Sequence, residues 1–388
     1  MAWLTDTDRR LIALTWAVKL GVLLVGAIAY VSFRNGAVNS PADILHMWSH
    51  WDAPHYLDLV VFGYRDGDSS SLVGPNGYRS IYPDDLALYF VFYPLFPWLA
   101  TVVNVVVRDP LVSVFVVTTI ASMFVAPLLY RLVRHDEEAS VALRAAWFLL
   151  IFPTAYFLHI GYTEALFMAL VLGSFLAARS DRWWLAGLLG GLAALTRING
   201  LVVIPALAAE AYTQWLLRPA AERRLRVEWL AIGLVAMGFG VYLALNYVIY
   251  GSPFEFLRIQ HEHWFKSLAA PWDAISGAFR WFNSDKPDNR LMYGFMELLF
   301  VGIGLAGTIF AAFRFRPSWF IWMAGNMLLF VSTSFLLSTP RYAFTLFPLF
   351  VSLALASART WALVLLSALS LAGLVYFAGR FATGWWAF

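Results

Sequence analysis

A cluster of acidic, imidazole and aromatic side chains between residues 46 and 56 is the part of the sequence best equipped for chemistry. Its one carboxylate, Asp52, stands among three histidines and three aromatic rings. A carboxylate among indole and phenol rings is partly desolvated, which raises its basicity and suits it to take a proton from an attacking hydroxyl. We therefore predict that Asp52 is a catalytic base and that Trp51, His55 and Tyr56 contact a substrate, for example by stacking on a sugar.

This cluster has two other interpretations. Trp and Tyr collect at the headgroup level of membranes, so the rings could form an interfacial belt, although a belt needs neither an acid nor three histidines. The cluster also offers metal-ligand types at close spacing, namely His46, His50, Asp52 and His55. We predict no metal site and no required cofactor, because no third ligand completes the helical His46 and His50 pair. A loosely bound divalent cation stays open, since three more acids lie nearby: Asp58, Asp84 and Asp85.

Four later segments supply further candidate substrate-binding residues. They are Tyr162 and Glu164, Arg197 and Asn199, Gln260 and Trp264, and Arg341 and Tyr342. Glu164 begins an apolar helix, where it could cap the helix or accept hydrogen bonds from sugar hydroxyls. Arg197 and Arg341 border apolar segments, where a charge is costly and a planar guanidinium can bind phosphate. Arg197 could instead extend its side chain to the membrane surface.

The loop that holds Gln260 predicts an amphipathic helix lying on the membrane surface. Phe254, Leu257, His261 and Trp264 recur there at helical spacing. This helix could float on the membrane or form one wall of the site. Glu297, in the next apolar segment, could be a site residue or pair with another helix, and the sequence does not choose.

The composition identifies the setting of these residues as a membrane. Of 388 residues, 61% are hydrophobic and 13% are charged, against about 25% charged in soluble domains. This balance excludes a soluble enzyme and a disordered chain and predicts an all-α polytopic protein in a lipid bilayer. The absence of cysteine excludes disulfides and sulfur-ligated metals. No basic stripe indicates nucleic acid.

The positive-inside rule gives an orientation. Arg9 and Arg10 precede an apolar run, Leu11 to Phe33, which is too long for a signal peptide and predicts an uncleaved first span. The segment Leu86–Val107 is demoted to a re-entrant or interface-lying piece, because Pro94 and Pro97 interrupt it and a full span would place the later basic loops outside. Eleven spans result: 11–33, 111–133, 143–159, 163–179, 183–199, 200–217, 227–250, 291–313, 318–337, 342–357 and 361–380.

This topology brings the candidate residues to one side of the membrane. The loop 34–110, the turn 159–164, the loop 251–290 and the turn 338–342 all fall on the outer face. We predict a single domain over residues 1–388, whose outer loops 34–110 and 251–290 form a cap over the active site. The expected location is a prokaryotic plasma membrane, with the N-terminus in the cytoplasm.

Several motifs in fixed order resemble one known family. They are Trp51-Asp52-Ala53-x-His55-Tyr56, Gly63-Tyr64, Tyr93-Pro-Leu-Phe-Pro97, Pro153 to Tyr162-x-Glu164, Thr196-Arg197 to Gly200, Gln260 to Trp264, and Pro340-Arg341-Tyr342. Between about Trp48 and Pro348, the chain resembles the GPI α-mannosyltransferase II (PIG-V type) family in its shorter prokaryotic form.

The resemblance implies a GT-C fold: a transmembrane helical bundle whose long first outer loop carries short interface helices. It also implies an inverting mannosyltransferase that uses a polyprenyl-phosphate sugar donor, with Asp52 at the position of the family's essential acid. The acceptor, a glycolipid or lipid-linked molecule, cannot be carried over in detail, and a small membrane partner subunit stays open. The rival functions are a flippase or transporter of lipid-linked sugars and a glycan ligase that uses polyprenyl pyrophosphate.

Overall fold

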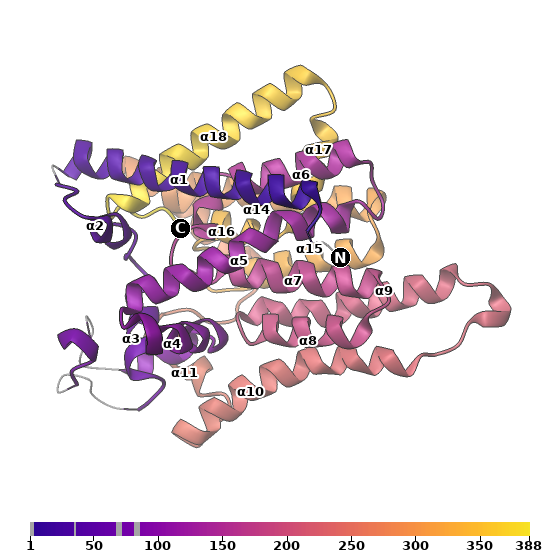
Figure 1. Ribbon diagram of the computed structural model, residues 1–388, viewed down its shortest axis with the longest axis horizontal. Coiled ribbons are helices and arrows are strands. Elements are labelled where there is room, and N and C mark those ends of the chain that lie inside the picture. The colour runs from indigo at the N-terminus through magenta and orange to yellow at the C-terminus, as the bar shows by residue number, and fades with distance from the viewer. Residues whose placement is uncertain (1–3, 35, 67–71, 81–85) are drawn as a thin grey trace.

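Helices make up nearly all the regular structure in the computed structural model, which describes residues 4–34, 36–66, 72–80 and 86–388 (Figure 1). The α-helices are α1 (Asp6–Arg34), α2 (Pro41–His46), α3 (Ala53–Phe62), α4 (Leu95–Val107), α5 (Pro110–Val133), α6 (Ala139–Ile151), α7 (Glu164–Arg179), α8 (Trp183–Ala194), α9 (Val203–Leu217), α10 (Gly233–Tyr250), α11 (Glu255–Glu262), α12 (Pro271–Phe282), α13 (Pro287–Asn289), α14 (Met296–Arg314), α15 (Pro317–Val331), α16 (Thr339–Ala343), α17 (Phe347–Ala356) and α18 (Thr360–Ala382). The 3-10 helices are η1 (Pro75–Gly77), η2 (Leu86–Val91), η3 (Ala155–Leu158), η4 (Ile198–Val202), η5 (Ala220–Glu222) and η6 (Val227–Ile232), and η7 (Arg290–Phe295) is a π-helix.

Local sequence signals explain where many of these helices begin. Ser40 and Asp43 form a capping box at the start of α2, and Asp109 caps α5 by accepting a hydrogen bond from the main chain at 2.9 Å. Pro110 follows at the first helical position, where its missing N–H costs nothing. α1 has acidic residues in its first turn and Arg34 in its last, which complements the helix dipole.

Within the described residues, six helical segments are long and apolar enough to cross a membrane. They are Asp6–Arg34, Pro110–Val133, Ile198–Leu217, Val227–Tyr250, Pro287–Arg314 and Thr360–Ala382. The all-α polytopic prediction is therefore confirmed, and the chain is an integral membrane protein. The predicted count of eleven spans is not confirmed, because the other segments form shorter helices than expected.

Short apolar helices are a feature of this fold and have a physical cause. α6, α8, α15 and α17 contain 13, 12, 15 and 10 residues, fewer than the about 20 that a bilayer requires. α6 ends because Phe152 is extended before Pro153, a residue that disfavours a helical predecessor. The irregular backbone that follows, from Thr154 to Thr163, is buried. Non-helical backbone is tolerated at membrane depth where protein surrounds it.

Ion pairs between loops define one end of the molecule, which we call the basic end. The pairs are Arg179–Asp136, Arg316–Asp136, Arg314–Glu137 and Arg226–Asp181. They bring together the basic stretches that follow α5, α7 and α14 and those that join α9 to α10. Because α7 begins at Glu164 and ends at Arg179, Glu164 lies at the opposite end, which we call the site end.

The segment 34–110 covers the site end through α2, which lies beside α1 in Figure 1, and through α3 and α4, which lie near α11. A fully buried carboxylate, Asp58, organises this loop by accepting hydrogen bonds of 2.6 Å from Tyr78, Ser80 and Tyr89. In agreement with the demotion of Leu86–Val107, this segment forms η2 and the 13-residue α4 rather than one long helix.

Candidate active site

A chain of four charged side chains lies at the site end. Arg341 donates hydrogen bonds to Asp52 at 2.6 Å and to Glu164 at 2.5 Å, and Arg197 donates to the same oxygen of Glu164. The four residues come from four segments, of which the first and last are 289 positions apart. They contain two positive and two negative charges. We call them the site cluster. Its most accessible member is Asp52, whose side chain is 26% exposed, whereas Glu164 is completely buried.

The backbone around Asp52 holds its carboxylate toward Arg341. The Tyr162 hydroxyl donates to the His50 carbonyl at 2.6 Å and accepts from the Asp52 N–H at 3.2 Å, so one phenol holds this turn on two sides. Trp51 has a positive φ of 57°, an unusual backbone conformation for a large residue. Asp52 precedes α3 without capping it, and its side chain is therefore available to Arg341.

A buried carboxylate on α14 positions Arg341 from behind. Glu297 accepts hydrogen bonds from the main-chain N–H groups of Ser338 at 2.7 Å and Thr339 at 2.9 Å, and Ser338 has the positive φ of a left-handed residue. The Thr154 hydroxyl donates to the Pro340 carbonyl at 2.9 Å. The question that the sequence left open about Glu297 is thus resolved, because this residue anchors the turn that carries Arg341.

Aromatic rings and acids together keep Arg341 charged. Its guanidinium carbon lies 4.7 Å from the ring centroids of both Phe157 and Tyr162, within cation–π distance. Burial alone would lower the Arg341 pKa, but the carboxylates of Glu164 and Asp52 hold the pKa above its ordinary value. The Tyr162 phenol is also buried, which raises its pKa, so it stays neutral and serves as a hydrogen-bonding group.

Glu164 does more than cap α7. Its Oε1 atom accepts from both arginines, and Arg197 also donates to the Thr163 hydroxyl at 2.9 Å. Its other oxygen, Oε2, is buried and receives no hydrogen bond from another of the described residues. A buried carboxylate is stable only when it is paired, and here two guanidinium groups share one oxygen. The Arg197 side chain is 15% exposed and pairs with Glu164. It therefore does not extend to the membrane surface.

Aromatic side chains beside Asp52 join the segment 34–110 to the segment 251–290. We call them the aromatic wall. The His55 ring lies 5.1 Å from Phe92 and 5.4 Å from Trp264, and Tyr56 lies edge-on to Phe92 and Tyr162. Burial lowers the pKa of His55, against smaller opposing effects of Asp52 and Asp58. Burial and the nearby Asp52 raise the pKa of Tyr56. Both side chains are therefore neutral at pH 7.

Lys266 is a site-end residue that the sequence analysis did not select. Its ammonium nitrogen lies 5.7 Å from the Tyr342 ring centroid and 5.6 Å from that of Phe335. Arg197 lies 5.5 Å from the same Tyr342 ring. Over the residues that the structure describes, Lys266 forms no ion pair. The one sequence signal was rarity, since the chain has three lysines in 388 residues.

Three predicted site residues have other partners than the site cluster and the aromatic wall. Trp51 points away from Asp52 and packs edge-on against Trp386 at 5.0 Å. Asn199 donates to Asn326 of α15 at 3.0 Å, because the 3-10 helix η4 turns it into the bundle, away from Arg197. Gln260 contributes its main-chain carbonyl, which accepts from the Lys266 N–H at 3.1 Å. It thus shapes the loop that carries the lysine.

The apolar residues in and around α11 divide between two environments. Phe256 and Ile259 are buried against the protein, whereas Phe254 and Leu257 are about half exposed. The structure packs the other face of this helix, because the interior lies on that side. Of the predicted stripe, Trp264 alone packs into the aromatic wall.

The predicted ligand types for a metal do not converge in the described part of the chain. Within residues 4–34, 36–66, 72–80 and 86–388, no group of three or more His, Asp or Glu side chains is arranged to hold a metal ion. Asp58 directs both carboxylate oxygens to hydroxyl groups. Asp84 and Asp85, the other acids considered for a loosely bound cation, lie outside the described residues.

Comparison with known proteins gives a family match in the middle of the chain. Residues 93–245 match the family described as dolichyl-phosphate-mannose-protein mannosyltransferase. Over this stretch, which is less than half of the chain, the sequence is similar to that mannosyltransferase family. A 168-residue stretch is 33% identical to GPI alpha-1,6-mannosyltransferase 2 of Mus musculus, and a 170-residue stretch is 31% identical to the Rattus norvegicus protein. The predicted resemblance to the GPI mannosyltransferases is thereby confirmed.

The matched stretches cover 40% of this chain but only 29% and 30% of the mouse and rat proteins. Solved structures with a related arrangement include the apo Archaeoglobus fulgidus oligosaccharyltransferase, with a TM-score of 0.49 at 15% identity over 95% of this chain and 56% of that one. Another is ArnT from Cupriavidus metallidurans bound to undecaprenyl phosphate, with a TM-score of 0.48 at 18% identity over 92% of this chain and 62% of that one.

Proposed function

We propose that the chain is an inverting mannosyltransferase that takes mannose from a polyprenyl-phosphate donor and passes it to a glycolipid or lipid-linked hydroxyl. The observation that carries this proposal is the site cluster, which holds one accessible carboxylate against a buried network of fixed charges at the end of a membrane bundle. The mannosyltransferase match over residues 93–245 supports the reaction class.

Asp52 acts as the general base in this proposal. The acceptor hydroxyl oxygen attacks C1 of the sugar while its proton passes to the Asp52 carboxylate, and the bond from C1 to the phosphate oxygen breaks on the opposite face. Arg341 donates to one carboxylate oxygen at 2.6 Å, and this contact fixes the orientation of the carboxylate that accepts the proton. Proton transfer by a positioned base contributes about 10²- to 10⁴-fold to a rate.

The departing phosphate needs positive charge, and Lys266 is best suited to supply it. Arg341 and Arg197 are already paired with Asp52 and Glu164, so they add little net charge at the surface of the cluster. Lys266 lies over aromatic rings and forms no ion pair among the described residues, and its electrostatic partner, the buried carboxylate of Glu297, is beyond ion-pair distance. It can exchange these rings for phosphate oxygens, and fixed charges at a developing anion are an effective form of transition-state stabilisation.

Transfer of radiolabelled mannose tests the proposal directly. The purified protein is incubated with polyprenyl-phosphate mannose and a membrane lipid extract, and the labelled lipid is separated by chromatography. We expect product from the wild type, and a rate lower by about 10²- to 10⁴-fold from Asp52→Asn. Asp285→Asn removes an exposed acid on the second outer loop and is the matched control, with wild-type activity.

Two results would contradict the proposal. Equal transfer by the wild type and Asp52→Asn would exclude the assigned base. Transfer of the intact donor across a vesicle membrane without any covalent product would indicate a flippase. A glycan ligase is distinguished by competition, because polyprenyl pyrophosphate would then inhibit more strongly than polyprenyl monophosphate.

A further inference from the structure

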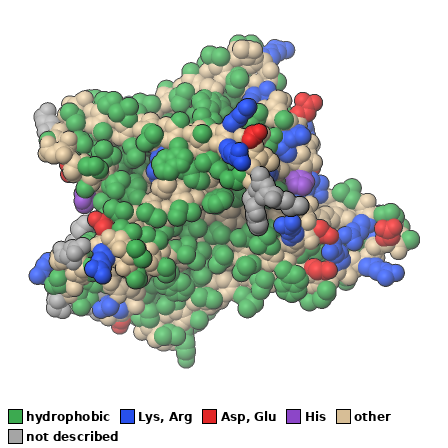
Figure 2. All heavy atoms as spheres, in the orientation of Figure 1, with side chains coloured by type: hydrophobic (Ala, Val, Ile, Leu, Met, Phe, Trp, Pro, Cys, Tyr) green, Lys and Arg blue, Asp and Glu red, His purple; other side chains and the backbone are tan. Residues whose placement is uncertain are grey.

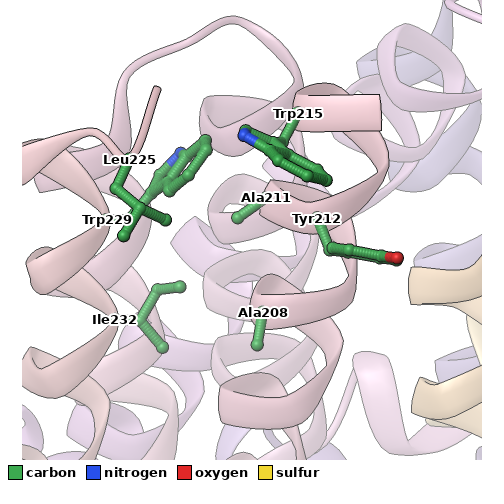
Figure 3. A pocket seen from close by; sticks show the side chains of 7 residues that line it. All are labelled: Ala208, Ala211, Tyr212, Trp215, Leu225, Trp229 and Ile232. Atoms are coloured by element: carbon green, nitrogen blue, oxygen red, sulfur yellow. The ribbon is translucent and has the colours of Figure 1, made fainter. Parts of the chain in front are cut away.

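A groove at the basic end, far from the site cluster, lies between α9 and the segment that leads into α10 (Figure 3). It has a volume of about 380 Å³ and is lined by Ala208, Ala211, Tyr212, Trp215, Leu225, Trp229 and Ile232. The small side chains of Ala208 and Ala211 leave the space open on the α9 side, opposite Ile232 and Trp229. This volume falls within the range of small-molecule sites, about 300–1,000 Å³.

The wall of the groove is apolar apart from a few polar atoms that point to a lipid with a polar head. The indole Nε1 atom of Trp229 is buried and has no hydrogen-bond partner among the described residues. Indole rings prefer the headgroup level of a bilayer, where the ring is in an apolar region and the N–H finds an acceptor. The Trp229 ring therefore indicates that this part of the groove lies at the headgroup level.

The loop that closes the groove carries an excess of positive charge. Between residues 218 and 228 it contains four arginines against two glutamates. Basic side chains gather at this tip of the molecule in the space-filling view (Figure 2). Arg226 is paired with Asp181 and with Glu228 at 3.3 Å, and Arg223 lies over the Trp215 ring at 5.3 Å. Arg218 and Arg224 form no ion pair with any described residue.

We infer that this groove binds the acyl chain of an anionic phospholipid, whose headgroup is held by Arg218 and Arg224. Charge complementarity selects this occupant: a zwitterionic headgroup would bring a second cation toward a loop that already has a positive excess. The acyl chain covers Ala208 and Ile232 and lies against the Trp229 ring. Lipid bound here would stabilise the protruding α9–α10 pair.

Photo-crosslinking with defined lipids tests this site. The full chain is placed in nanodiscs that contain a trace of a diazirine-bearing phospholipid, either phosphatidylglycerol or phosphatidylcholine, and labelled peptides are mapped by mass spectrometry. We expect the phosphatidylglycerol probe to label residues 208–232 about five- to tenfold more than the phosphatidylcholine probe. The double variant Arg218→Gln/Arg224→Gln should abolish this preference.

The matched control is Arg134→Gln/Arg359→Gln, which removes two exposed arginines from other loops and should retain the preference. Ala208→Trp fills the groove and should lower labelling by both probes, while the thermal unfolding midpoint shows that the variant is folded. Equal labelling of the wild type by the two probes would overturn the inference. So would crosslinks from residues 208–232 to a second copy of the chain, because a protein would then cover the groove.

Discussion

The molecule contains two buried charge networks, one at each end of α7, and they are built differently. At the basic end, Glu210 uses both carboxylate oxygens: Arg316 donates to one at 2.8 Å and to the other at 3.1 Å, and Ser318 donates to the second at 2.8 Å. Arg179 binds Asp136 through two parallel bonds of 2.7 and 2.9 Å. Bidentate pairs of this kind are strong and geometrically rigid.

The site cluster satisfies its groups less completely. Arg341 divides its guanidinium between two acids with one bond to each, and Glu164 concentrates both arginines on a single oxygen. Its second oxygen has no donor from elsewhere in the described chain. Asp52 is also partly open to its surroundings. The difference indicates that the basic-end network holds loops together, whereas the site cluster retains hydrogen-bonding capacity for a substrate.

The largest expected effect comes from making the same Glu→Gln substitution in each of the two networks and comparing stability and activity. Glu164→Gln and Glu210→Gln each remove a buried carboxylate charge from between two arginines, leaving Asp52 or Asp136 as the remaining acid. Each should lower the free energy of unfolding by about 3–5 kcal/mol. Only Glu164→Gln should also abolish mannose transfer when both variants are assayed well below their unfolding midpoints. Scanning fluorimetry on tryptophan gives the midpoints. If Glu210→Gln were inactive while folded, the functional distinction between the two networks would be wrong.

The next largest effect is expected from substituting Lys266, and it concerns the binding of the donor rather than the stability of the protein. Lys266→Met removes the unpaired cation and should raise the KM for polyprenyl-phosphate mannose about tenfold or more, since hydrogen bonds to charged groups contribute about 1.5–3 kcal/mol. Lys266→Arg keeps the charge and should recover most of the affinity. Lys286→Met removes an exposed lysine and is the control. An unchanged KM in Lys266→Met would remove this residue from the phosphate site.

A smaller effect concerns pH and the aromatic wall. Burial lowers the pKa of His55, so the folded protein keeps this ring neutral while the unfolded chain gains a proton below pH about 6.5. The contribution of His55 to stability is therefore complete above that pH and is lost as the pH falls. His55→Phe should reduce the slope of the free energy of unfolding against pH, below pH about 6.5, by up to about 1.4 kcal/mol per pH unit.

The measurement is the unfolding midpoint between pH 5 and pH 8, with the exposed His261→Phe as control. Other buried histidines contribute in the same direction, so the wild-type slope is not expected to vanish in the variant. A His55→Phe slope as steep as that of the wild type would show that the ring is not held neutral.

The smallest effect expected is that of metal removal. Arginine and lysine supply the positive charge of the proposed site, so treatment with EDTA should leave the rate of mannose transfer unchanged. The assay compares treated protein with and without added Mg²⁺ or Mn²⁺. A loss of activity that either cation restores would contradict the expectation and direct attention to the acids of the first outer loop.

The sequence predicted the membrane setting, the helical class and the gathering of Asp52, Glu164, Arg197 and Arg341, because hydropathy and charge bias constrain which loops meet. It could not predict the short helices. Their ends depend on irregular backbone such as residues 152–163, which is stable only because the rest of the protein surrounds it.

Individual side-chain roles were also beyond the sequence. Asn199 is two residues from Arg197, yet the 3-10 turn between them directs the two side chains to different partners. Glu297 accepts hydrogen bonds from main-chain N–H groups 41 and 42 positions away. No local sequence pattern predicts such a contact. Lys266 could be recognised as a site residue only from its contacts with the rings of Tyr342 and Phe335.

The helix α7 has a consequence for how this chain can change in evolution. It carries Glu164 of the site cluster in its first turn and Arg179 of the basic-end network in its last, and most of its residues are buried. Inserting or deleting one residue would rotate one end by about 100° and shift it by about 1.5 Å relative to the other. Either network could then form only if the other broke. Descendants of this sequence should therefore vary freely in loop length but keep the number of residues between Glu164 and Arg179 fixed.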